Sequence, residues 1–184
     1  YENGIMFDDG TLLKLSETGF RWVCGDEYAG EWLKEQAKKK KFKVVIKNST
    51  DQINNVSIQG PNSRKILEKI IFTPPTQPTV SELQWFRFTI CRLEELNGIP
   101  LIVSRTGYTG ELGYEVWCHP DHAPHVWDKV MEVGKKDGLI PAGFGALDLL
   151  RIEAGLVLFG NEFDGQVDPF EAGVGFTVPL KTKK

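Results

Sequence analysis

The segment from Ser104 to Glu115 places three glycines, two tyrosines and two carboxylates in one short stretch, Ser-Arg-Thr-Gly-Tyr-Thr-Gly-Glu-Leu-Gly-Tyr-Glu. Glycine permits positive φ angles and a close approach of the backbone to a ligand. A tyrosine ring offers a stacking face, and a carboxylate can accept two parallel N–H bonds from one edge of a ligand. This set suits a flat heteroaromatic ligand with an amino-imino edge, such as a pterin. The alternative is a glycine-rich surface hairpin, although aromatic and acidic side chains are seldom so dense in a simple connection.

Two neighbouring residues of this segment, Tyr114 and Glu115, fall on a predicted strand. Successive side chains of a strand point to opposite faces. One of the two must therefore face the core and the other the site.

Two adjacent acids, Asp8 and Asp9, stand before Gly10 on a turn that leads into a predicted strand. They also point to opposite faces of an extended chain, so only one of them can easily face a pocket. Such a carboxylate could hold a ligand N–H or accept a proton. Taken alone, the Asp-Gly pattern is more typical of a solvated hairpin turn.

Other reactive residue types have simpler interpretations. The three cysteines are widely spaced, with no zinc pattern, and are expected to be small buried hydrophobes. His122 and His125 lie three residues apart without acidic neighbours in a metal pattern, so no metal site is expected. The lysines at 38–41 complement a helix C-terminus or, alternatively, meet an anionic substrate tail. Asp148 and Arg151 are spaced to form an ion pair within one helix.

Hydrophobic periodicity predicts the elements that must position these residues. Strands are expected at 12–15, 20–24, 42–46, 56–59, 86–93, 99–104 and 114–118. Helices are expected at 27–40, after the turn at 60–63, at 121–135 and at 143–154. Strands and helices are interleaved and several hairpins occur, so we predict an α+β fold with mixed, mainly antiparallel sheets and packed helices.

Bulk composition excludes several classes of protein. The chain has 184 residues and a net charge of -3, and its apolar runs are far shorter than a membrane span. We therefore expect neither a nucleic-acid nor a membrane partner. The sparse cysteines and the lack of a signal-peptide pattern favour a cytoplasmic location, or the mitochondrial matrix in a eukaryote. The chain begins at Tyr1 rather than Met, which favours a segment of a longer polypeptide.

Five segments, in order along the chain, resemble the folate-dependent aminomethyltransferases. Residues 104–115 are similar to the signature of that family, and residues 2–9 to its Asp-Asp turn. Residues 58–61 match its Gln-Gly-Pro turn, and residues 140–155 and 168–173 are similar to later elements. The resemblance implies a folate-binding core that uses tetrahydrofolate. It also implies that residues 1–80 form part of a first subdomain and residues 81–184 a second, which leads to a C-terminal barrel outside the chain.

The resemblance also assigns roles to particular residues. Asp9 corresponds to the catalytic acid near the reactive N5 edge of the folate. Tyr108 and Glu115 correspond to folate-binding residues, of which Glu115 holds the pterin. Trp85 or Phe86 corresponds to an aromatic residue that lines the cavity.

This sequence departs from the family pattern at Ile5, Gly25 and Leu147, where a glycine, an asparagine and an arginine are usual. The lack of the arginine at Leu147 resembles relatives that take methyl or methylene groups from other donors, such as methylamine oxidases and folate-dependent demethylases. Two functions therefore stay open. One is transfer of a one-carbon group from a small-molecule amine or methylated donor, or from a carrier protein, to tetrahydrofolate. The other is a folate-binding module that traps one-carbon units made by a fused or partner flavin domain.

A third interpretation is a paralogue that has lost folate. The presence of Asp9, Tyr108 and Glu115 together disfavours it.

Overall fold

The computed structural model describes residues 1–180 and divides into two compact units. The first unit contains Tyr1–Asn48 and the chain from Val157 onward, and the second contains Ser49–Leu156. The expected boundary between residues 80 and 81 lies inside the second unit, so these units divide the chain differently from the expected subdomains. The subdomain assignment stays a prediction.

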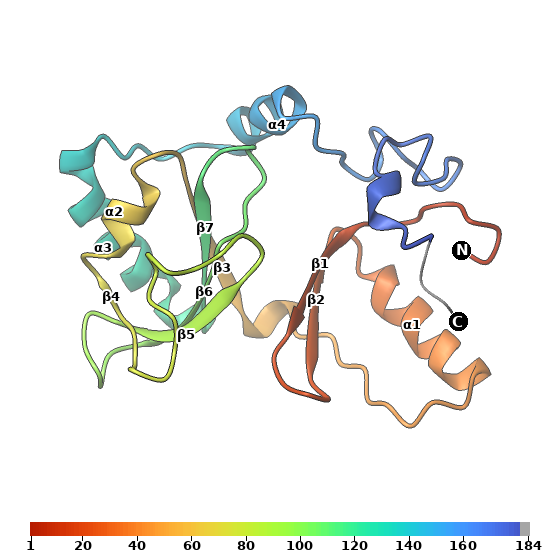
Figure 1. The fold of residues 1–184 in the computed structure, drawn as a ribbon, viewed down its shortest axis with the longest axis horizontal. Coiled ribbons are helices and arrows are strands. Elements are labelled where there is room, and N and C mark those ends of the chain that lie inside the picture. The colour runs from red at the N-terminus through yellow and green to blue at the C-terminus, as the bar shows by residue number, and fades with distance from the viewer. Residues whose placement is uncertain (181–184) are drawn as a thin grey trace. The chain divides into compact units, whose positions relative to one another are not determined.

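The first unit contains an antiparallel hairpin followed by a helix (Figure 1). Its elements are β1 (Gly10–Lys14), β2 (Phe20–Cys24), α1 (Tyr28–Lys39) and a short 3-10 turn, η4 (Gly175–Thr177). The hairpin turn is closed by Ser16, whose Oγ accepts the Gly19 N–H at 2.8 Å. A small core of Met6, Val157 and Phe163 joins the two segments of this unit.

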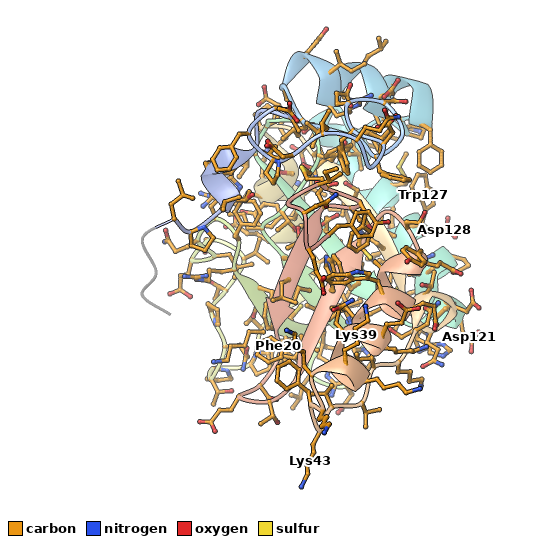
Figure 2. The ribbon with its side chains drawn as sticks, turned by 90° about the vertical axis from the view of Figure 1, so that its right-hand side faces the viewer. Phe20, Lys39, Lys43, Asp121, Trp127 and Asp128 are labelled. Carbon is orange, nitrogen blue, oxygen red and sulfur yellow. The ribbon has the colours of Figure 1, made fainter. Side chains whose placement is uncertain are left out.

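The segment 42–46, predicted as a strand, is irregular, so this prediction was wrong. Its β-branched residues favour an extended chain, but a strand also needs a partner for its backbone groups. Among the described residues none pairs with it, and Val45 is 96% exposed. Lys43 points away from the ribbon into solvent (Figure 2).

The second unit is built on a five-stranded antiparallel sheet with the order β3-β7-β6-β5-β4. Its strands are β3 (Asn54–Gln59), β4 (Ile71–Phe72), β5 (Phe88–Leu93), β6 (Pro100–Ser104) and β7 (Gly113–Cys118). Its helices are α2 (Ser63–Leu67), α3 (Ala123–Gly134) and α4 (Phe144–Glu153), with the 3-10 turns η1 (Thr50–Gln52), η2 (Pro120–His122) and η3 (Lys135–Asp137). The predicted α+β class with mainly antiparallel sheets is confirmed.

Helices α2 and α3 lie beside the sheet, where α2 contacts β7 and α3 contacts β3 (Figure 1). The alternation of side chains along the strands separates two faces. One face forms the main core with the helices, and includes Ile58, Val103, Tyr114 and Val116. The other face carries Glu115 and its cross-strand partners, Ser57 and Ser104.

Thr89 is a polar residue on the core face of the sheet. Thr89 on β5 is fully buried, and its Oγ1 has no hydrogen-bond partner within residues 1–180. A buried hydroxyl without a partner costs free energy. We predict that Thr89→Val stabilises the protein by roughly 1 kcal/mol. A higher urea midpoint with an unchanged slope would show this. A lower midpoint would mean instead that the hydroxyl is satisfied, for instance by water.

Candidate functional site

The Glu115 carboxylate is held at the half-buried face of β7 by donors from two other segments. Asn55 Nδ2 on β3 donates to Oε1 at 2.9 Å, and Thr106 Oγ1 donates to Oε2. The preceding residue, Tyr114, points the other way and is fully buried, with its hydroxyl accepting from Arg64 Nε at 3.1 Å. A carboxylate offers about four lone-pair positions, so each oxygen of Glu115 retains acceptor capacity.

The loop that leads to Glu115 is bonded to β3 through the side chain of Gln59. Its Nε2 donates to the carbonyl oxygens of Thr106 and Tyr114, each at 3.3 Å. A Cβ atom at Gly113 or Gly107 would lie 1.6 or 2.0 Å from Gln59 Oε1, so these two positions must be glycine for the amide to enter.

The glycines of the loop therefore have different purposes. Of Gly107, Gly110 and Gly113, Gly110 has a positive φ, +73°, whereas the other two admit Gln59. Gly110 also lies against α4, because a Cβ there would be 2.7 Å from the Ala154 Cβ. The loop is thus held between β3 and the end of α4.

Trp85 and Phe86 form an exposed aromatic pair just before β5. Their rings are stacked with centroids 5.9 Å apart, and the residues are 69% and 60% exposed. The Phe86 N–H donates to the Arg105 carbonyl at 3.1 Å, which places the pair next to the loop that carries Tyr108. Phe86 has a φ of +54°, a left-handed conformation that is strained for a bulky residue.

The two acids of the first unit have different environments. Asp8 Oδ1 accepts from the N–H groups of Asp9 and Gly25 at 2.9 and 3.3 Å, and Oδ2 accepts from the Asp26 N–H at 3.0 Å. Asp8 therefore fastens the turn between β2 and α1. The Asp9 side chain, in contrast, accepts no hydrogen bond from residues 1–180. Partial desolvation, with the charge of Asp8 as a second cause, raises the pKa of the Asp9 carboxyl.

The sequence analysis did not predict the burial of Arg151 or the contact of Asn55 with Glu115. Arg151 is almost fully buried on α4; its Nε donates to Asp148 Oδ1 at 2.8 Å, which confirms the predicted pair. Its burial had one sequence signal, an arginine on the apolar stripe of a helix. Asn55, which holds Glu115, had none, because its position is set by the pairing of β3 with β7.

The cysteines follow their prediction in two of three cases. Cys91 and Cys118 are buried, but Cys24 is exposed, so for Cys24 the prediction was wrong. Shielding of its sulfur and the neighbouring Asp8 raise the pKa of Cys24 to about 11. The thiol is therefore protonated near neutral pH and is a poor nucleophile.

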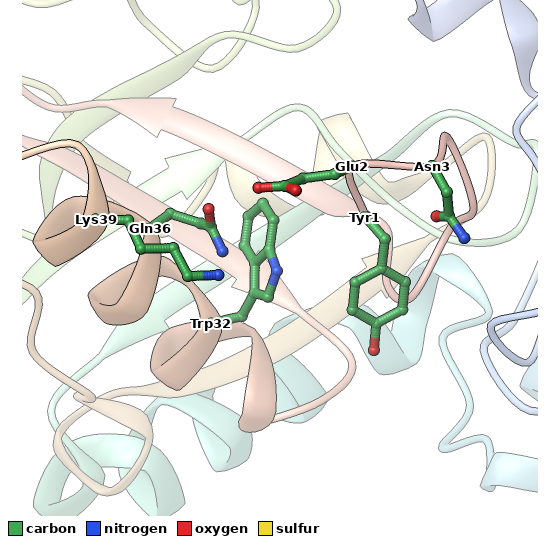
Figure 3. Close-up of a pocket in the computed structure, with 6 residues that line it drawn as sticks. All are labelled: Tyr1, Glu2, Asn3, Trp32, Gln36 and Lys39. Carbon is green, nitrogen blue, oxygen red and sulfur yellow. The ribbon is translucent and has the colours of Figure 1, made fainter.

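A shallow depression on the first unit contains none of the predicted site residues (Figure 3). Its lining is Tyr1, Glu2, Asn3, Trp32, Gln36 and Lys39. Within residues 1–180, no His, Cys, Asp and Glu side chains gather in a group of three or more that could hold a metal ion. Over the same range, no helix has the length and apolarity needed to cross a membrane.

Residues 1–182 match the model of the GCVT N-terminal domain, and the chain belongs to this family. The resemblance to the aminomethyltransferases is confirmed.

Individual relatives refine this assignment. The chain is 53% identical over 183 residues to the trimethylamine-oxide aldolase of Ruegeria pomeroyi; the match covers 100% of this chain and 23% of that protein. It is 39% identical to the aminomethyltransferase of Alkaliphilus metalliredigens, covering 98% of this chain and 47% of that enzyme. The chain thus spans about a quarter to a half of the length of these relatives.

A solved structure shows the same fold. The glycine cleavage system aminomethyltransferase T of Bartonella henselae superposes with a TM-score of 0.72 at 24% identity, over 97% of this chain and 45% of that one.

The fit between Gln59 and the loop generates a prediction. Gly113→Ala would force the Gln59 amide out, so we expect a loss of roughly 1–3 kcal/mol of stability from the freed buried polar groups. Gly30→Ala on α1, where a Cβ would have nothing within 4 Å, should be neutral or stabilising. Urea unfolding of both variants measures this, and equal stabilities of Gly113→Ala and wild type would contradict the proposed fit.

The different environments of Asp8 and Asp9 generate another prediction about stability. The pKa of the Asp9 carboxyl is higher in the folded than in the unfolded protein, so its ionisation at neutral pH destabilises the folded state. Below the unfolded-state pKa the carboxyl is protonated in both states, and this destabilisation is absent. Asp9→Asn should therefore raise the melting temperature at pH 7, and the gain should vanish near pH 3. Asp8→Ala should lower it at pH 7, because it leaves three N–H groups without their acceptor. The opposite order of the two variants would show that the register of the turn is wrong.

Proposed function

We propose that this chain is the folate-binding part of an enzyme that transfers a one-carbon group from an amine or methylated donor to tetrahydrofolate. The observation that carries the proposal is the Glu115 carboxylate, fixed by two protein donors while acceptor positions remain on both oxygens. The amino-imino edge of a pterin presents two neighbouring N–H groups that match such a carboxylate.

The residues of this chain suit that ligand. Glu115 would accept the N–H groups of the pterin, and the exposed rings of Trp85 and Phe86, with Tyr108, would supply stacking surface. Tetrahydrofolate, when bound, supplies the nitrogen nucleophiles that accept the one-carbon unit. The Asp9 carboxylate accepts no hydrogen bond from residues 1–180. It would stabilise positive charge as the one-carbon unit moves.

The donor we propose is a methylated amine or amine oxide. The 53% sequence identity to a trimethylamine-oxide aldolase exceeds the 39% identity to an aminomethyltransferase. Leu147, half-buried on α4, stands where the resemblance described above implies an arginine in the aminomethyltransferases. Cleavage of a methylated amine oxide to an amine and formaldehyde needs no external oxidant, because the carbon is oxidised while the N–O bond is reduced.

The second candidate is a folate-binding module that traps one-carbon units made by a fused or partner flavin domain. It is favoured by the length of the trimethylamine-oxide aldolase, of which this chain matches 23%. The two candidates share the folate site and differ in where the one-carbon unit is made.

The folate site is tested by calorimetry of the full-length protein with tetrahydrofolate. We predict roughly micromolar affinity, about -8 kcal/mol. Glu115→Gln replaces one acceptor oxygen by a donor, and should weaken binding by about 1–3 kcal/mol. Glu111→Gln, an exposed acid of the same loop, is the matched control and should bind like wild type. Absence of binding by the wild type would refute the proposed function.

The donor is tested by turnover of the same protein in the presence of tetrahydrofolate. We expect formation of the one-carbon folate product from trimethylamine oxide, and none from an aminomethyl-lipoyl carrier protein. Asp9→Asn should reduce kcat by roughly 10²-fold while folate affinity changes less than about tenfold, because its charge acts mainly in the transition state. Rapid turnover of the carrier protein would contradict the choice of donor.

A further inference from the structure

A chain of hydrogen bonds runs from a buried tryptophan to the Glu115 carboxylate. Trp117 Nε1 donates to Ser104 Oγ at 3.1 Å, Ser104 Oγ lies 2.7 Å from Thr106 Oγ1, and Thr106 Oγ1 donates to Glu115 Oε2. Trp117 and Glu115 are two residues apart on β7 and share one face of the sheet, and Ser104 is the cross-strand partner of Glu115. The members thus come from β6, β7 and the loop between them.

The chemistry of the groups fixes the direction of this chain. An indole N–H only donates, and an ionised carboxylate only accepts. Thr106 has a single hydroxyl proton and gives it to Glu115, so Ser104 must donate its own proton to Thr106. Each hydroxyl therefore accepts one bond and donates one, in a single order from Trp117 to the carboxylate.

The chain is buried along its length. Ser104, Thr106 and Trp117 are 1%, 5% and 6% exposed, whereas Glu115 is half-buried. Hydrogen bonds in such a shielded environment are strengthened and polarise one another. The terminal torsion of a glutamate is otherwise broadly distributed.

We propose that Trp117, Ser104 and Thr106 are positioning residues that fix the plane of the Glu115 carboxylate before the ligand binds. The inference rests on the proposed function, in which Glu115 accepts the amino-imino edge of tetrahydrofolate. Asn55 holds the other oxygen at 2.9 Å, so both oxygens are oriented from the protein side. A carboxylate oriented in advance loses less conformational freedom on binding.

The test compares two substitutions at Thr106 by calorimetry of the full-length protein with tetrahydrofolate. Thr106→Val keeps the shape and removes the hydroxyl, and should weaken binding about tenfold or more. Thr106→Ser keeps the hydroxyl and should bind within about threefold of wild type, which is less than the net worth of one hydrogen bond. Ser104→Ala breaks the chain one link earlier and should weaken binding in the same direction; it decides the question if Thr106→Val does not fold.

The chain offers a matched control. Thr89→Val makes the same chemical change at a buried position of the same sheet, but on the core face. It should leave tetrahydrofolate affinity unchanged. A second ligand, 2-desamino-tetrahydrofolate, lacks one of the N–H donors that Glu115 would accept, so the loss caused by Thr106→Val should be smaller for it.

The outcomes separate the two proposals. If the wild type binds tetrahydrofolate and Thr106→Val binds equally well, the positioning role is overturned and the proposed function stands. Equal losses for tetrahydrofolate and its 2-desamino analogue would also overturn it, because Thr106 would then act on the loop rather than on Glu115. A wild type that does not bind tetrahydrofolate overturns the proposed function itself.

Discussion

The side-chain amide of Gln59 is the interaction on which the candidate site depends. Gln59 is the last residue of β3, and its amide donates to the carbonyl groups of Thr106 and Tyr114. It therefore joins the start of the loop to the start of β7. At the far end of the loop the Leu112 carbonyl adds to this attachment, because it accepts from the Gly60 N–H at 2.7 Å and from Ser63 Oγ at 3.3 Å. Gly107 and Gly113 are the consequence, because any side chain at either position would occupy the space of the amide. The Gln-Gly-Pro turn and the glycine-rich signature are thus joined in one contact, in which Gln59 and Thr106 are 47 residues apart in the sequence.

This contact fits the register in which β3 pairs with β7 around Glu115. Gln59 pairs with Gly113, so Ser57 pairs with Glu115 and Asn55 with Trp117. A shift of one residue would send Glu115 into the core and Tyr114 to the exposed face. With the register fixed, Asn55 lies within reach of one carboxylate oxygen and the loop brings Thr106 to the other. The packing of the sheet and the orientation of the candidate ligand group therefore have the same physical origin.

Local patterns predicted much of this fold. The strand at 20–24 has the predicted bounds, and α1 begins and ends within one residue of its prediction, because alternation and helical periodicity are properties of short segments. The strand predicted at 42–46 failed because strand formation also depends on a distant partner. For the same reason the sequence pointed to Glu115 but not to Asn55 or Trp117, which reach it through pairing between strands. The positive φ of Phe86 had no sequence signal, since no glycine or asparagine marks it.

Three of the predicted site residues have features that cost stability. The pKa of Asp9 is raised by desolvation and by Asp8, so its ionised form opposes folding; Phe86 is held in a strained conformation; and Trp85 leaves most of its ring in water. Their neighbours offset these costs. Asp8 accepts hydrogen bonds from three backbone N–H groups, and Tyr114 fills the core. The Arg105 carbonyl accepts from the Phe86 N–H, and the Arg105 side chain donates to the Leu83 carbonyl at 3.0 Å. Asp8 is thus adjacent to Asp9 in the sequence, and Arg105 is joined to Phe86 by one backbone hydrogen bond. Selection for folding alone disfavours such residues, and the binding and catalytic roles proposed above would account for their presence.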